Sequence, residues 1–352
     1  MSSFRHALKR SCVALALRRI TRDQNIVRPL AAAASPFSSL SSGAPKTSTR
    51  LMSTFSPGAP PGTNGSPVFK DIDFSVADSS SSESIVRNAD PLAVFVVTGA
   101  SRGIGLEFVK QLVDRTKGTV VACCRSPESA TVLQEFTAGL EDSSRVQIIA
   151  LDVEDQKSIE SAGSVIKDRF GRVDVLLNVA GILGDAKTTP GPERSLSKLD
   201  RDWFEKTMAV NLIGPVMLSK ELAPLMMQRR KKKISPDEEQ RAVAVIANLS
   251  ARVGSISDNG MGGWYSYRMS KTALNQATRT MALELKRSST WCIALHPGTT
   301  QTDLSKPFSS NVKEDKLFPV DFTVSQLLDI IDAMDEETSG GFYDWSGQAL
   351  SF

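Results

Sequence analysis

The residues of this chain best suited to chemistry are a tyrosine and a lysine four positions apart, Tyr267 and Lys271. Residues with this spacing lie on one face of a helix. A tyrosine hydroxyl has an ordinary pKa of about 10 and is a poor base at neutral pH, but a neighbouring ammonium favours the phenolate and lowers that pKa. Such a pair can exchange a proton with an alcohol or carbonyl oxygen. The same spacing fits an ordinary surface pair, so the surrounding elements decide the interpretation.

A glycine-rich stretch upstream, residues 98–105, has the form of a nucleotide-binding turn. It follows the apolar run 94–97 and precedes an amphipathic stretch, so the order is strand, turn, helix. Backbone N–H groups of such a turn reach a pyrophosphate at the start of the helix, where the helix dipole favours negative charge. The predicted cofactor-binding residues of the turn are Gly99, Ser101, Arg102, Gly103, Ile104 and Gly105.

The end of the second predicted strand bears on the choice between the two nicotinamide cofactors. An acid about 20 residues past the glycine turn holds the 2′-hydroxyl of NAD, whereas an arginine accommodates the 2′-phosphate of NADP. Arg125 stands at this place, directly after the apolar run 119–124, and Arg102 in the turn adds a second positive charge. We therefore expect NADP(H) to be preferred, with NAD(H) as the alternative, although both arginines would also fit as solvated surface residues.

The elements needed to position these residues alternate along the chain. Short runs rich in Val, Ile, Leu and Ala are typical of strands buried on both faces, and helical patterns separate them. This order predicts an α/β fold: a single Rossmann-type, doubly wound parallel sheet of about seven strands with helices on both faces. The expected strands are 94–97, 119–124, 146–151, 173–178, 242–248, 292–296 and 341–344, and the expected helices are 105–115, 127–140, 155–170, 200–228, 267–287 and 324–334.

The chain ahead of this alternation differs in composition. Residues 1–50 hold nine Lys or Arg and one acid and are rich in Ser and Ala, which is typical of a targeting presequence. Residues 50–55 resemble a mitochondrial processing site, so we expect a presequence at 1–55 and a mitochondrial location. A plastid transit peptide is the alternative, and a cytoplasmic location follows if the segment carries no address. The Pro/Gly/Ser-rich and acidic Ser-rich stretches beyond it predict a disordered linker at 56–90, with the folded domain at 91–352.

Charge and composition argue against several other classes of protein. Beyond residue 50 the chain holds 33 basic and 38 acidic residues, so we expect no nucleic-acid partner. The apolar run 12–17 is too short to span a membrane. Four cysteines, three of them in predicted strands, do not predict a disulfide scaffold, and two histidines without Cys/His spacing predict no metal site. The charged segment 229–239 is typical of a solvated loop between a helix and a strand.

Together these motifs resemble the short-chain dehydrogenase/reductase family, over residues 91–352. The turn at 98–105 matches the family's Thr-Gly-x-x-x-Gly-x-Gly cofactor loop, and residues 178–181 are similar to its Asn-Asn-Ala-Gly motif. The resemblance implies further cofactor contacts from Asp152, Val153, Asn178, Ala180, Gly181, Tyr267, Lys271, Pro297, Gly298 and Thr302.

The resemblance also implies catalytic roles. Tyr267 would be the acid/base, Lys271 its ribose-binding partner, and Asn211 the residue that holds a proton-relay water. The family usually carries two adjacent serines after the fifth strand, of which the second polarises the substrate carbonyl. Here Ser250 aligns with the first and an alanine, Ala251, with the second. We expect Ser250 to take the role; substitution by Ser255 or a weakened role are the alternatives.

The function implied is that of an enzyme, a short-chain dehydrogenase/reductase that transfers hydride between NADP(H) and a carbonyl or alcohol substrate. Residues 250–259 and 340–347 resemble the C-factor and sniffer-type carbonyl reductases of the family. Two alternatives are a non-catalytic NADP-binding or signalling protein, which Ala251 favours, and an organelle ketoacyl-carrier-protein reductase. The predicted partner is a small-molecule substrate, held by loops 183–195 and 300–320. A homodimer or homotetramer through helices 200–228 and 267–287 is expected by resemblance, without a membrane span.

Overall fold

The computed structural model describes residues 69–77, 82–184, 191–227, 241–309, 312 and 316–352. By its contacts the chain divides into two units, Met1–Gly62 and Thr63–Phe352, and every described residue belongs to the second. The predicted presequence at 1–55, the first part of the predicted linker and the charged segment 229–239 lie outside the described residues.

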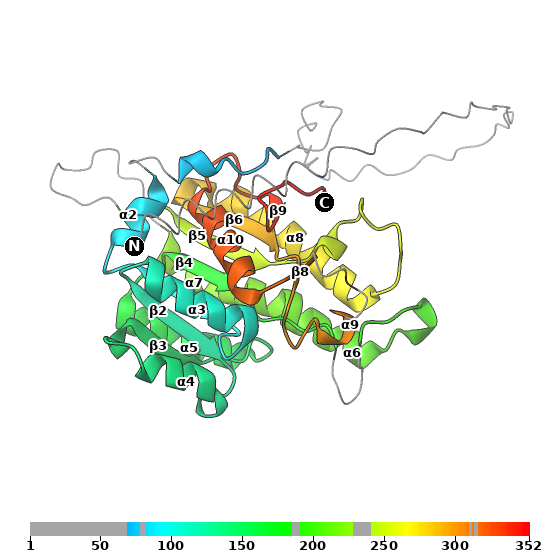
Figure 1. Ribbon diagram of the computed structural model, residues 1–352, viewed down its shortest axis with the longest axis horizontal. Coiled ribbons are helices and arrows are strands. Elements are labelled where there is room, and N and C mark those ends of the chain that lie inside the picture. Colours follow the sequence, from blue (N-terminus) through cyan, green and yellow to red (C-terminus); the bar gives the residue numbers. More distant parts are fainter. Residues whose placement is uncertain (1–68, 78–81, 185–190, 228–240, 310–311, 313–315) are drawn as a thin grey trace, which may run out of the picture. The chain divides into compact units, whose positions relative to one another are not determined.

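Seven parallel strands form one sheet in the order β3-β2-β1-β4-β5-β6-β9, which confirms the predicted fold class (Figure 1). The order reverses between β1 and β4, and at such a point an open parallel sheet has a crevice at its carboxyl ends. The strands are β1 Val94–Thr98, β2 Thr119–Cys124, β3 Val146–Ala150, β4 Val175–Asn178, β5 Ala244–Leu249, β6 Thr290–His296 and β9 Phe342–Asp344, with a separate short pair of β7 Thr299–Thr300 and β8 Leu317–Phe318.

Helices connect these strands, and some of them begin and end at capping residues that the sequence provides. For example, Asp155 accepts a hydrogen bond from the Lys157 N–H at 3.0 Å ahead of α5, and Gly171 ends that helix with a left-handed φ of 65°. The helices are α2 Glu83–Ala89, α3 Gly103–Arg115, α4 Thr131–Ala138, α5 Gln156–Phe170, α6 Arg201–Met208, α7 Gly214–Met226, α8 Tyr265–Leu285, α9 Lys306–Ser309 and α10 Val320–Asp332.

Two apolar cores, one on each face of the sheet, hold these layers together. Phe95 and Val97 of β1 pack in the core that contains residues of α3 and α10. Val94 and Val96 of the same strand pack in the other, with residues of α5, α7 and α8. A strand covered on both sides needs apolar residues at every position, which is why its apolar run is continuous rather than alternating.

The helix predicted at 200–228 is interrupted in the structure. After α6 a π-helical turn occupies Ala209–Ile213, and α7 begins only at Gly214. Such turns widen a helix locally and are frequent at functional sites. This one carries Asn211, whose side chain is completely buried. The apolar pattern continues through the turn, so periodicity alone does not reveal it.

The linker predicted at 56–90 is wrong for its described part. That part contains α2, and Arg87 of this helix pairs with Asp332 of α10 at 3.0 Å. Further upstream, the Ile72 N–H donates to the Gly347 carbonyl oxygen at 2.8 Å. The polar composition wrongly indicated disorder, because these residues bond to the surface of the domain instead of building a core of their own.

The three described cysteines are buried free thiols, which confirms their predicted packing role. Burial raises the pKa of Cys123 and of Cys292 to about 12, so both stay protonated and pack as small apolar side chains. In the described part of the chain no helix combines the length and apolar character that crossing a membrane requires.

Candidate active site

The glycine turn after β1 lies where the strand order reverses. Gly99 has a φ of 67°, which glycine adopts without strain. A Cβ on Gly105 would lie 2.2 Å from the Gly99 carbonyl oxygen, so only glycine allows α3 to approach this closely. The Thr98 hydroxyl accepts hydrogen bonds from the N–H groups of Val179 at 2.9 Å and Ala180 at 3.1 Å. The turn and the segment after β4 therefore form one continuous surface at the carboxyl edge.

The start of α3 is open to an anion. Arg102 stands at the cap position and makes no side-chain cap, so no side chain covers the first-turn N–H groups of Gly103 and Gly105. Ser101 and Ile104 are half-buried beside them. Free N–H groups at a helix start, where the dipole is positive, suit a pyrophosphate. The residues present therefore fit a dinucleotide.

Two arginines lie next to this turn and to the end of β2. The Ala100 N–H donates to the Cys123 carbonyl oxygen at 3.0 Å and so brings the turn beside β2. Arg125 directly follows β2, is exposed, and has no ion pair with another described residue. Arg102 is also exposed, but its Nη1 lies 3.3 Å from Oδ2 of Asp303. Both arginines thus lie in the region where the sequence predicts the 2′-phosphate of NADP, and Arg102 forms an ion pair with Asp303 there.

Asp152 and Val153 follow β3, as predicted for residues beside an adenine. Asp152 Oδ1 accepts from the Glu154 N–H at 3.0 Å, and the Asp152 N–H donates to Ser158 Oγ at 2.9 Å. Val153 is buried against α7, where a Cβ on Gly214 would lie 2.6 Å from its carbonyl oxygen. These contacts hold the turn rigidly while one oxygen of the Asp152 carboxylate makes no bond to another described residue.

The Asn178 side chain is buried in the sheet, although it was predicted to contact the cofactor. Its Nδ2 donates to Asn248 Oδ1 at 2.8 Å and to Ser219 Oγ at 3.2 Å. Asn248 donates in turn to Thr278 Oγ1 at 2.8 Å. This chain of bonds ties β4 and β5 to α7 and α8. Within the motif it is Gly181, three residues further on, that reaches the site.

Residues far apart in the sequence meet around Gly181. A Cβ on this glycine would lie 3.3 Å from Asn211 Oδ1 and 3.7 Å from Lys271 Nζ. Lys271 Nζ lies 5.7 Å from the centroid of the Tyr267 ring and donates to the Leu249 carbonyl oxygen at 2.7 Å. The structure therefore brings together three of the four predicted catalytic residues, Asn211, Tyr267 and Lys271.

The Asn211 amide joins the segment after β4 to α8. Its Oδ1 accepts from the Ile182 N–H at 2.8 Å, and its Nδ2 donates to the Ile182 carbonyl oxygen at 2.8 Å and to Ser270 Oγ at 3.3 Å. This side chain belongs to the π-helical turn and is fully buried. The relay-water role stays a prediction, whereas the clamping contacts are part of the fold.

Burial dominates the ionisation of the tyrosine and the lysine. It raises the pKa of Tyr267 well above its usual value and lowers the pKa of Lys271 from 10.5 to about 7, because loss of water disfavours the charged form of each group. The expectation that the ammonium lowers the tyrosine pKa is therefore wrong for this structure. Desolvation of the phenol sets the direction of the shift, although the lysine Nζ lies 5.7 Å from the centroid of the ring.

The Ser250 hydroxyl is not free to serve the site, and the Ser255 hydroxyl bonds within its own loop. Ser250 is buried, and its Oγ donates to Asn275 Oδ1 at 2.6 Å. Ser255 is also buried, and its Oγ accepts from the Asp258 N–H at 3.1 Å. Ser250 would have to break its bond to Asn275 to reach a carbonyl, so the geometry does not support the role predicted for it. Ala251 is half-buried in the loop after β5.

The segment after β6, which is predicted to contact the nicotinamide, borders the glycine turn. Thr302 Cγ2 would lie 3.6 Å from a Cβ on Gly103. Pro297 accepts a hydrogen bond from the Thr300 hydroxyl at 3.3 Å. The neighbouring Gly298 packs against an aromatic cluster, in which the ring centroids of Phe318 and Trp345 are 4.5 Å apart and Phe322 is the third member.

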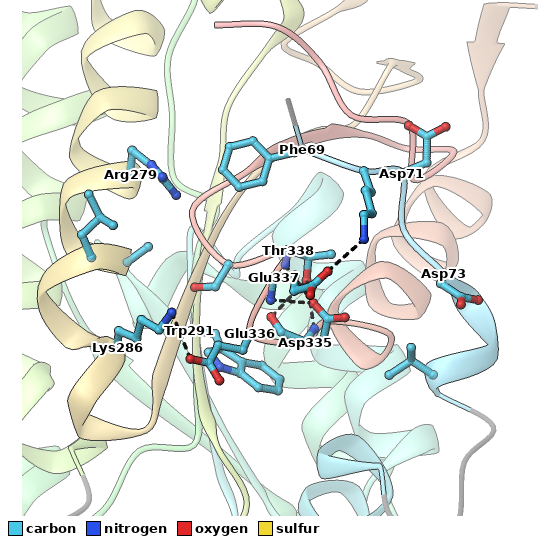
Figure 2. A pocket seen from close by; sticks show the side chains of 15 residues that line it. Phe69, Asp71, Asp73, Arg279, Lys286, Trp291, Asp335, Glu336, Glu337 and Thr338 are labelled. Carbon is cyan, nitrogen blue, oxygen red and sulfur yellow. Dashed lines mark hydrogen bonds and ion pairs between the residues drawn. The ribbon is translucent and has the colours of Figure 1, made fainter. Parts of the chain in front are cut away.

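A cavity of about 480 Å³ lies elsewhere, between residues 69–76, the end of α8 and the turn before β9 (Figure 2). Its carboxylates already have partners: Glu337 pairs with Lys70 at 3.2 Å and Glu336 with Lys286 at 3.0 Å. No predicted site residue lines it. Over the described ranges, no three His, Cys, Asp or Glu side chains gather to hold a metal ion.

Sequence reasoning missed two acidic residues at the site. Glu193 is buried and bonds to Ser266, the neighbour of Tyr267. Asp303 pairs with Arg102 of the glycine turn. Neither acid belongs to a local motif, because each meets its partner only through the fold, so the sequence carries no signal that would have singled them out.

Comparison with known proteins gives this site its context. Residues 93–313 match the short chain dehydrogenase family. The chain is 33% identical over 177 residues to the C-signal of Myxococcus xanthus, covering 50% of this chain and 91% of that protein. The structure is similar to the NADPH-bound carbonyl reductase from chicken fatty liver, with a TM-score of 0.63 and 29% identity over 74% of this chain and 98% of that one. It is also similar to the carbonyl reductase Sniffer of Drosophila melanogaster, with a TM-score of 0.63 and 27% identity over 74% of this chain and 99% of that one.

The fold, the dinucleotide turn and the tyrosine–lysine pair define a nicotinamide-dependent oxidoreductase on a Rossmann-type sheet. The chain belongs to the short-chain dehydrogenase family and is a carbonyl-reductase-like oxidoreductase within it. The predicted resemblance to the C-factor and sniffer-type subgroup is thereby confirmed.

Proposed function

We propose that this protein reduces a small carbonyl substrate with NADPH and that Tyr267 donates the proton. The observation that carries the proposal is the pair of half-buried Tyr267 and buried Lys271, which shares its site with Gly181 and Asn211 beside the dinucleotide turn. No hydrogen bond joins the tyrosine hydroxyl to another described residue, so it is free to bind a substrate oxygen.

The ionisation of the pair suits reduction. Bound NADPH supplies the hydride to the carbonyl carbon, and Tyr267 gives its proton to the carbonyl oxygen. The phenol of Tyr267 carries its proton at neutral pH, although burial raises its pKa and so makes that proton harder to give up. The phenolate left behind gains from the protonated form of Lys271, whose pKa of about 7 lets it change charge near physiological pH. Asn211 holds the segment after β4 against α8 meanwhile.

The preference for NADPH over NADH rests on charge at the end of β2. Arg125 replaces the acid that would bind the ribose 2′-hydroxyl of NAD, and it is exposed and free to pair with a 2′-phosphate. Arg102 supplies a second cation from the glycine turn once it leaves Asp303.

The test is NADPH oxidation by the full chain with a panel of aldehydes, diketones and quinones. Tyr267→Phe removes one oxygen and should lower kcat by about 10²–10⁴-fold, the range expected for loss of a general acid, without weakening NADPH binding. Tyr265→Phe, two residues earlier in the same helix, is the matched control and should keep its activity. Equal activity of Tyr267→Phe and wild type would refute the proposed role.

A second candidate function is non-catalytic binding of NADP(H), as in a signalling protein. It is favoured by Ala251, which has no hydroxyl, and by Ser250, whose hydroxyl already donates to Asn275. This candidate predicts NADPH binding by fluorescence but no turnover of any carbonyl in the same panel. Turnover that Tyr267→Phe abolishes would exclude it.

Location and assembly complete the proposal. The basic, acid-poor composition of residues 1–50 supports import into mitochondria, which fusion of residues 1–55 to a fluorescent protein tests. Exposed apolar residues on the π-helical turn and α8 (Ile213, Met269 and Leu283) support a homodimer or homotetramer. Sedimentation of the wild type and of Leu283→Glu tests the assembly.

A further inference from the structure

We propose that Glu193 is a positioning residue, which holds the start of α8 and thereby sets the place of Tyr267. Glu193 belongs to the loop after β4, more than seventy residues before the helix it contacts. Its effect on turnover rests on the proposed function, but its effect on the helix does not.

The start of α8 has no local cap of its own. Trp264 occupies the cap position and makes no side-chain cap. Its φ of 56° is left-handed, as are those of Gly262 (67°) and Gly263 (66°) before it. A left-handed aromatic residue is strained, and such strain persists only where the surrounding structure over-determines it. Something outside the helix must therefore hold this segment.

Glu193 supplies the holding contacts with both its backbone and its side chain. Its carbonyl oxygen accepts from the Trp264 N–H at 2.5 Å. One carboxylate oxygen accepts from the Ser266 N–H at 3.3 Å, and the other accepts from the Ser266 hydroxyl. A Cβ on Gly263 would lie only 3.4 Å from the carbonyl oxygens of Glu193 and Arg194. Glu193 thus binds the strained Trp264 itself and Ser266, two residues further along.

The burial of this carboxylate shows that its partners matter. Glu193 is 5% exposed, and it makes no ion pair with the rest of the described chain. A buried carboxylate without a counter-charge is costly unless hydrogen bonds satisfy it. Here Ser266 provides two of them, and the positive end of the α8 dipole favours negative charge at this point. The contact between the Glu193 carboxylate and Ser266 therefore depends on the exact placement of both residues.

Tyr267 lies directly against the held segment. It follows Ser266 in the chain, and its ring meets the Trp264 ring edge to face, with centroids 6.3 Å apart at 69°. Lys271 lies one turn further along the same helix. A shift at Ser266 and Trp264 would consequently move the phenol relative to Lys271, whereas the NADPH-binding turn belongs to another element and would stay in place.

The experiment compares three substitutions at this position in the full chain. Glu193→Gln can still accept from the Ser266 N–H and can donate to its hydroxyl oxygen, so kcat should stay within threefold of wild type. Glu193→Asp keeps the charge but is one methylene too short, and Glu193→Ala removes the contacts. Both should lower kcat at least tenfold, with the Kd for NADPH changed less than twofold. A geometric role thus predicts rescue by Gln and not by Asp.

The matched control is Asp155→Asn, which alters a capping carboxylate at the start of α5, a different helix from the one that carries Tyr267. It should leave kcat unchanged. Wild-type kcat in Glu193→Asp, equal losses in Glu193→Gln and Glu193→Ala, or an equal loss in the Asp155 control would each overturn the proposal. Where Glu193→Ala does not fold, Glu193→Gln and Glu193→Asp decide the question alone.

Hydrogen exchange separates this proposal from the proposed function. Backbone amides of residues 264–268 should exchange at least tenfold faster in Glu193→Asp than in wild type and Glu193→Gln, whether or not any carbonyl is turned over. If wild type turns over no substrate but this exchange pattern appears, the reductase proposal fails and the role of Glu193 stands. Unchanged exchange in Glu193→Asp would overturn the role of Glu193.

Discussion

Replacing Lys271 by methionine should make the protein more stable at neutral pH and less stable at alkaline pH. The lysine is 4% exposed, and its only bond to the described residues is that from Nζ to the Leu249 carbonyl oxygen, at 2.7 Å. Burial lowers its pKa from 10.5 to about 7. Methionine has a similar volume and no charge, so the substitution removes the ionisation and the bond and little else.

The sign follows from proton binding in the two states. Between pH 7 and 10.5 the unfolded chain holds the lysine proton and the folded chain does not, so the free energy of unfolding of wild type rises with pH. At about 1.4 kcal/mol per pH unit, the rise over this interval totals about 5 kcal/mol. Lys271→Met lacks this dependence.

The loss of the bond opposes this gain. An unsatisfied Leu249 carbonyl oxygen costs about 1–3 kcal/mol, so Lys271→Met should be more stable than wild type by about 2–4 kcal/mol at pH 7. The two stabilities should cross near pH ~9, and the variant should be the weaker protein above that.

Urea unfolding followed by tryptophan fluorescence, at several pH values from 7 to 10 without added cofactor, measures both free energies. Lys220→Met, an exposed lysine of α7, is the control and should differ from wild type by the same small amount at every pH. A difference between Lys271→Met and wild type that does not change with pH would refute the reasoning, because the lysine would then ionise alike in both states.

Three further predictions follow from the site. Ala251→Ser restores the family's second serine in a half-buried loop position. Because one hydrogen-bond donor contributes about 10²–10³ in rate, kcat for carbonyl reduction should rise at least tenfold. An unchanged kcat would show that no donor is missing there. Asp303→Asn frees Arg102 from its 3.3 Å ion pair, so the ratio of kcat/KM for NADPH over NADH should rise severalfold, and a ratio that stays constant contradicts this. Burial lowers the pKa of His296 to about 4, so the unfolded chain takes up this proton at a higher pH than the folded chain does. The stability of wild type relative to His296→Gln should therefore fall as the pH drops from 6.5 to 4. At about 1.4 kcal/mol per pH unit the fall is roughly 3 kcal/mol, which unfolding experiments at each pH measure.

The sequence by itself determined the fold class, the glycine turn and the tyrosine–lysine spacing. Strands buried on both faces must be apolar throughout, and a dinucleotide turn needs glycine at positions such as Gly99 and Gly105. These are local requirements, so residues next to one another in the chain reveal them. The Tyr267–Lys271 pair is local in the same sense, since the helix alone puts the two residues on one face.

Tertiary structure decided what depends on contacts between distant segments. Asn211 enters the site through a π-helical turn, Asn178 turns away into the sheet, and Ser250 gives its hydroxyl to Asn275. Hydrogen-bond partners and burial set the role of each of these side chains, and both are properties of the packed fold. For the same reason the direction of the Tyr267 pKa shift could not be inferred from its neighbour in the sequence: desolvation, which sets that direction, exists only once the surrounding elements have excluded water.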